Sequence, residues 1–63
     1  MTKEEIYQKA SGIIGIKAMT VNERLSESGL MKEFDRTKRH NKEIARTILQ
    51  ALRVDKASID KII

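Results

Sequence analysis

The residues of this chain that could do chemistry lie in one basic stretch, RTKRHNKE, at residues 36–43. A metal-independent ribonuclease could in principle be assembled there from Arg36, Arg39, His40 and Glu43. His40 is the only histidine and cysteine is absent, so a zinc or iron site is not expected. No spacing in the chain places a base beside a nucleophile together with a third group to orient that base. We therefore expect no enzyme activity, no metal and no cofactor.

The same stretch carries the densest positive charge. Residues 1–29 hold equal numbers of basic and acidic side chains, so residues 30–63 carry the whole net charge of +4. These cations could bind nucleic-acid phosphates with release of counterions, or they could bind an acidic protein. The simplest interpretation is a solvated helix end, where cations interact favourably with the helix dipole. The side chains concerned are Arg36, Lys38, Arg39, His40 and Lys42.

Only helices are predicted as the elements that position these residues. The chain has no proline and no alternating run of β-branched residues of the kind that forms half-buried strands. At 63 residues it forms one domain with a thin aliphatic core. We expect a single all-α domain, residues 1–63, of four to five short helices at about 2–14, 20–28, 30–39, 42–53 and 56–63.

Capping signals define the helix starts. Thr2 with Glu5, and Thr20 with Glu23, have the spacing of a capping box. Asn41 and Asp55 are residue types that accept hydrogen bonds at a helix start. Four helix starts are therefore predicted, and the second falls directly after Met19.

The apolar pattern adds a break at Gly29. In one continuous helix, Leu30 and Phe34 would lie on the face opposite Val21 and Leu25. A glycine in the left-handed conformation ends a helix and removes the conflict. The apolar residues then fall on one face of each helix: Ile6, Ala10, Ile13 and Ile14 in the first, Ile44, Ile48, Leu49, Ala51 and Leu52 in the fourth, and Ile59, Ile62 and Ile63 in the last.

The string TVNERLSESGLMKEFD, residues 20–35, resembles a group of small bacterial proteins of unknown function. These begin with Met-Thr/Ser-Val-Asn-Glu-Arg-Leu, continue with Ser/Ala-Gly-Leu and Glu-Phe-Asp, and end in an Ile-Leu helix followed by a short helix with an acidic cap. The matching part is residues 19–63. The resemblance implies an all-helical fold and no activity.

Members of this group begin where Met19 stands. One hypothesis is that Met19 is a translation start and residues 1–18 are an extension. The alternative, which we favour, is that the first helix belongs to the core through Ile6, Ile13 and Ile14. Within the matching string, Asn22 and Arg24 either contact a partner or, as we prefer, bond the Gly29 turn or a neighbouring helix end.

A second nucleic-acid signal lies in residues 42–63. The pieces EIA and LRVDKASIDKII resemble the halves of a helix-turn-helix, whose second helix enters the major groove. About four more residues than usual separate the pieces, and Arg53 stands where the turn usually has glycine. Four residues are close to one helical turn, so the apolar faces stay in phase. Asp55 and Asp60, however, suit a phosphate-lined groove poorly.

We expect a small cytoplasmic bacterial protein that binds another macromolecule. The apolar run GIIGI is too short for a membrane span or a signal peptide, and the absence of cysteine suits a reducing compartment. A protein partner is preferred over nucleic acid, and the role would be that of an adaptor, a regulator or an immunity or antitoxin-like inhibitor. Contacts are expected in the basic segment 36–42 and at apolar positions that a homodimer would also use, namely Leu30, Met31, Ile62 and Ile63.

Overall fold

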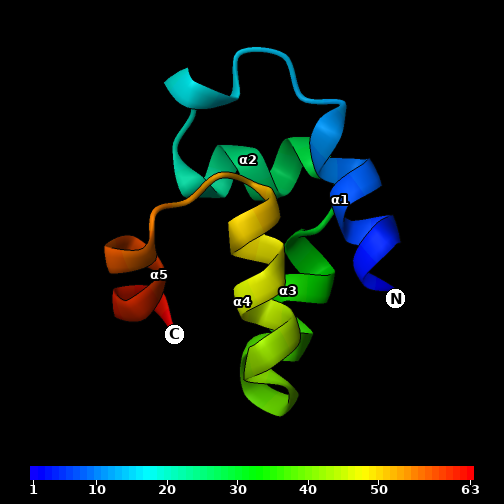
Figure 1. Ribbon diagram of the computed structural model, residues 1–63, viewed down its shortest axis with the longest axis vertical. Helices are drawn as coiled ribbons and strands as arrows, with labels where there is room; N and C mark the ends of the chain where they lie inside the picture. The colour runs from blue at the N-terminus through cyan, green and yellow to red at the C-terminus, as the bar shows by residue number, and fades with distance from the viewer.

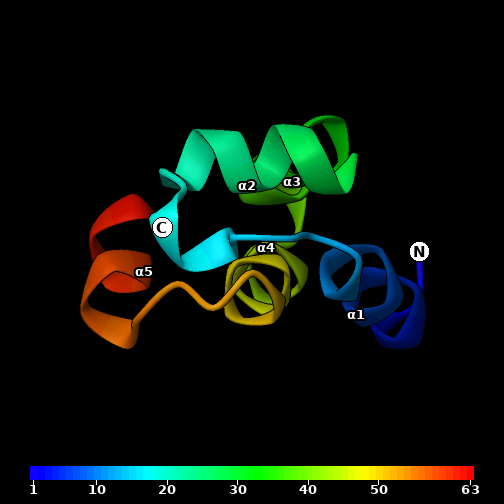
Figure 2. The ribbon, with the colours of Figure 1, turned by 90° about the horizontal axis from the view of Figure 1, so that it is seen from above.

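Helix α4 (Lys42–Ala51) lies at the centre of the fold in the computed structural model, which describes residues 1–63. Helices α1 (Lys3–Ser11) and α5 (Lys56–Ile62) flank it on opposite sides. Figure 2 shows α2 (Val21–Ser28) and α3 (Met31–His40) as a second layer across one face of this row. The prediction of an all-α single domain is confirmed, with a 3₁₀ turn, η1 (Ile16–Ala18), before α2.

The predicted caps form. The Thr20 hydroxyl accepts a hydrogen bond from the N–H of Glu23 at 3.2 Å, and the Glu23 carboxylate accepts one from the N–H of Thr20 at 2.9 Å. Thr2 and Glu5 make the same reciprocal pair. Asp55 accepts the N–H of Ser58 at 3.0 Å, and the Asn41 side chain accepts the N–H of Ile44. All four predicted capping residues thus accept a hydrogen bond from the residue three positions on, whereas α3 begins without a side-chain cap.

Gly29 ends α2 as predicted. Its φ of 76° is left-handed, a conformation that costs glycine little because it has no Cβ. The following N–H, that of Leu30, donates to the Leu25 carbonyl at 3.1 Å. This reversal lets Leu30 and Phe34 enter the same core as Leu25, where all three are buried.

The first and fourth helices are shorter than predicted. Helix α1 ends at Ser11, with Gly12 as its C-cap, because glycines at 12 and 15 make further helix unfavourable. The assignment of Ile14 to the core is wrong, since its side chain is 92% exposed. Helix α4 ends at Ala51 rather than at residue 53, because Arg53 is left-handed with a φ of 63°.

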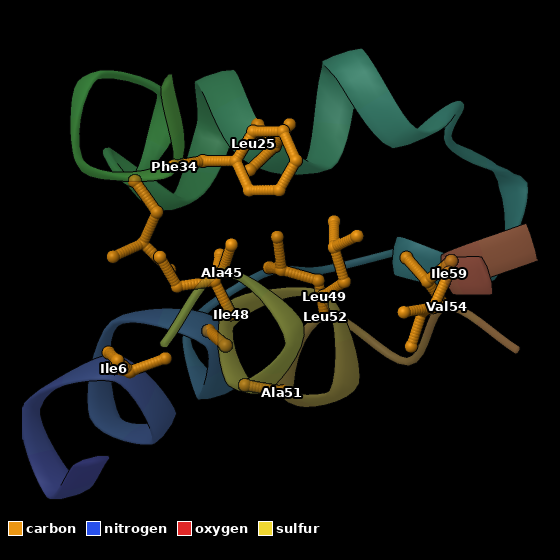
Figure 3. Close-up of a cluster of buried hydrophobic side chains, with 12 residues drawn as sticks. Ile6, Leu25, Phe34, Ala45, Ile48, Leu49, Ala51, Leu52, Val54 and Ile59 are labelled. Atoms are coloured by element: carbon orange, nitrogen blue, oxygen red, sulfur yellow. The ribbon is translucent and has the colours of Figure 1, made fainter. Parts of the chain in front are cut away.

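The core is small and mostly aliphatic, as expected for this length, and lies between the two layers (Figure 3). Ile6 and Ala10 place α1 in it, and Ile13 packs against its edge. The hypothesis that Met19 is a translation start stays a prediction. No helix has the length and apolar character needed to cross a membrane. The buried apolar residues are Ile6, Ala10, Leu25, Leu30, Phe34, Ala45, Ile48, Leu49, Ala51, Leu52, Val54 and Ile59.

Candidate functional site

An apolar cleft of about 350 Å³ opens between α2, α3 and the end of α5. Its apolar walls are Val21 and Leu25 from α2, Met31 and Phe34 from α3, and Ile62. Leu25 and Phe34 are core residues that form its floor, whereas Val21, Met31 and Ile62 are only partly buried. Apolar side chains are therefore accessible from outside at this point.

A basic cleft of about 470 Å³ lies next to it. Lys38 and Arg39 from the end of α3 and Lys42 from the start of α4 form its cationic walls, with Asp35 and Ile63. None of the three cations makes an ion pair. Three basic side chains and one acidic side chain line this cleft, so its side chains carry a net positive charge.

The two clefts share a wall on α3, formed by Asp35 and Lys38. Met31, Phe34, Asp35 and Lys38 are spaced three, four and seven residues apart, which places them on one face of the helix. The Lys38 ammonium lies 6.0 Å from the centre of the Phe34 ring, at the outer limit of a cation–π contact. The two clefts thus form one surface, apolar at the start of α3 and cationic at its end.

The structure brings together six of the side chains predicted to contact a partner, and excludes Leu30. Leu30 is fully buried at 0% exposure, because the Gly29 turn directs it into the core, so its assignment to a binding surface is wrong. Arg36 pairs with Glu33, and Arg36 and His40 lie outside both clefts. The residues that line the clefts are Met31, Lys38, Arg39, Lys42, Ile62 and Ile63.

The carboxylates with shifted pKa values are helix caps. The hydrogen bond from the Thr20 backbone N–H holds the pKa of Glu23 below its ordinary value of 4.5, and Thr2 does the same for Glu5. Hydrogen bonds from Ser58, first its hydroxyl and then its N–H, lower the pKa of Asp55. No group of three or more His, Cys, Asp or Glu side chains is placed to hold a metal ion. These shifts have their cause in helix capping.

Arg24 bonds a neighbouring helix end, which confirms the structural role preferred for it. Its Nη1 donates to the carbonyls of Leu52 and Arg53, each at 3.2 Å, just after the end of α4. Its Nε donates to the Met19 carbonyl at 3.1 Å. One guanidinium therefore joins the segment before α2 to the turn between α4 and α5. The same role is wrong for Asn22, whose exposed side chain makes no hydrogen bond and lines the apolar cleft.

Sequence reasoning missed a third cleft, of about 410 Å³, beside α1. Tyr7, Ile13 and Ile16 line it, together with Arg53. The exposed large apolar side chains of the chain are Met1, Tyr7 and Ile14, all in its N-terminal part. The helical spacing of the isoleucines was the signal that could have indicated this cleft, but it was interpreted as the pattern of buried core residues.

The helix-turn-helix-like segment corresponds to α4, the Arg53 turn and α5. The left-handed φ of Arg53 is the conformation that glycine favours at such a turn. Asp60 on α5 pairs with Arg46 of α4 at 2.9 Å and lies 3.9 Å from the Lys56 ammonium. Asp60 is thus engaged with two basic groups, whereas Lys61 on the same seven-residue helix makes no ion pair.

Searches against protein-family models, curated proteins and solved structures found no match to this chain.

Proposed function

We propose that this protein is a small non-enzymatic binding module that docks a protein partner in the joined apolar and basic clefts. The observation that carries the proposal is their common wall, Asp35 and Lys38. Protein interfaces combine an apolar centre with a polar, often charged rim, and this surface has both. The roles that suit such a module are adaptor, regulator or immunity or antitoxin-like inhibitor, acting in the cytoplasm.

Nucleic acid is the alternative partner. The left-handed turn at Arg53 between α4 and α5 favours it, together with the free cations Lys38, Arg39 and Lys42. Against it, Asp60 stands on the second helix of the motif. A phosphate-lined groove would repel this carboxylate.

The test is a tagged pull-down from source cells, with and without nuclease, read by mass spectrometry. The variant Lys38→Glu/Lys42→Glu reverses two exposed cations of the basic cleft. The matched control, Lys3→Glu/Lys17→Glu, makes the same charge change at exposed positions that line neither cleft. We expect one stoichiometric protein in both nuclease arms, retained by the control and lost from the double variant. Recovery that collapses with nuclease would instead establish nucleic-acid binding.

A further inference from the structure

We infer that the partner segment is an acidic amphipathic helix that lies along α3, with apolar side chains in the apolar cleft and carboxylates in the basic cleft. The inference rests on the proposed function and specifies its occupant. Helix-in-groove recognition places a row of apolar anchors, spaced three, four and seven residues apart, in an apolar groove. The surface along α3 has the matching spacing and adds charge at one end.

The length of the surface fits two turns of helix. From Met31 to Lys38 the axis of α3 rises by about 10 Å, at about 1.5 Å per residue. An occupant packed along α3 with an apolar residue against Met31 and Ile62 would place its residue seven positions away against Lys38. That residue should be Asp or Glu. A further carboxylate about one turn beyond it would reach Lys42, which begins the next helix.

The charges select an anionic occupant. Arg36 and Arg46 are already paired, with Glu33 and Asp60 respectively. Lys38, Arg39 and Lys42 have no anionic partner within ion-pair distance. Each therefore gains an opposite charge when a carboxylate enters the basic cleft, and complementary charge of this kind raises association rates and specificity.

The apolar half of the surface favours a protein helix over a nucleic acid. Binding to single strands uses exposed aromatic rings on which bases stack. Phe34 is only 5% exposed, and Tyr7 lies on α1, outside both clefts. The apolar side chains of Met31 and Ile62 form no hydrogen bond or ion pair with a phosphate backbone, whereas they can bury a leucine or isoleucine of a partner helix.

The test uses three synthetic helical peptides labelled with fluorescein and read by fluorescence polarisation. The first carries leucine and glutamate seven residues apart on one face. The second replaces its glutamates by lysine, and the third keeps the composition of the first but moves leucine and glutamate to opposite faces. Duplex and single-stranded oligonucleotides form a fourth arm. We expect the first peptide to bind more tightly than the other probes, and more weakly as salt rises.

Variants locate the binding. Lys38→Glu/Lys42→Glu should lower the affinity for the first peptide about tenfold or more, because it converts two attractions between charges into repulsions. Lys3→Glu/Lys17→Glu should leave the affinity unchanged. In amide NMR spectra of the wild-type protein, the peptide should shift Met31, Lys38 and Ile62.

Equal binding of all three peptides, or amide shifts confined to α1, would overturn the inference. Tighter binding of an oligonucleotide on the same residues would overturn it in favour of nucleic acid. A third outcome is that no peptide binds, while the pull-down recovers a nuclease-resistant protein that the double variant no longer retains. This result would reject the acidic helix as the occupant and keep the proposal of a protein-binding module. Failure of both experiments would reject both proposals.

Discussion

Replacing Arg24 by methionine should destabilise the fold more than its partly exposed position suggests. The guanidinium donates three hydrogen bonds to backbone carbonyls, those of Met19, Leu52 and Arg53. Methionine keeps an unbranched side chain with similar helix propensity, so Arg24→Met removes the donors and the charge with little other change. Two of the carbonyls directly follow α4, where a cation is also favoured by the helix dipole.

The magnitude follows from these contacts. A hydrogen bond with a charged partner contributes about 1.5–3 kcal/mol, but here one Nη1 is shared between two carbonyls and the site is partly solvated. We expect Arg24→Met to lower the free energy of unfolding by about 2 kcal/mol. A chain of this length has only about 3–9 kcal/mol of stability. Tm should fall by about 8–16 °C. Arg24→Lys should lose about half as much, because an ammonium keeps the charge but not the forked geometry.

Urea unfolding followed by circular dichroism measures the change, with equal m-values required for a valid comparison. Arg36→Met is the matched control, since Arg36 makes only an exposed ion pair with Glu33 and should cost about 0–1 kcal/mol. An Arg24→Met variant as stable as the control would refute the reasoning. If Arg24→Lys were as damaging as Arg24→Met, the contribution assigned to charge would be wrong.

Three further predictions concern stability. Arg53→Gly should stabilise the protein by about 0.5–1 kcal/mol in urea unfolding, because it relieves a left-handed non-glycine residue; a loss of stability would contradict this. Ile6→Ala should cost about 2–5 kcal/mol, because this fully buried side chain holds α1 in the core; no loss would show that α1 is dispensable. Because the pKa of Glu23 is lowered in the folded state, its stabilising effect is complete above the ordinary value of 4.5 and is lost as pH falls through the folded-state value. Glu23→Gln should therefore reduce the slope of stability against pH in acid, and an unchanged slope would contradict the capping role.

The helix starts could be predicted because a cap is a local interaction. Thr20 and Glu23 are three residues apart, and both hydrogen bonds form within that distance. Gly29 was predictable for a similar reason, since the apolar phases on its two sides are incompatible with one helix. The structure confirms both the cap at Thr20 and the helix end at Gly29, and each could be predicted from residues close to it in the sequence.

Burial of single side chains was harder to predict, since it depends on what the neighbouring helices cover. Ile14 has helical spacing from Ile6 and Ala10, yet the chain leaves the helix before reaching it. Leu30 was predicted as an apolar contact for a partner, but the left-handed Gly29 directs it inward. The apolar cleft could not be predicted because it requires Met31 and Ile62 to meet across the tertiary fold.

Arg24 connects stability to the binding surface. The start of α2 supplies Val21 and Asn22 to the wall of the apolar cleft, and Arg24 holds that start against the end of α4. Loss of these hydrogen bonds should therefore widen or loosen the cleft. It should also lower the affinity for a partner that Arg24 does not contact. Salt separates the two causes. The loss of partner affinity caused by Lys42→Glu should become smaller at high ionic strength, where exposed charges are screened. The loss of affinity caused by Arg24→Met should persist, because it arises from the position of α2 rather than from attraction to the partner.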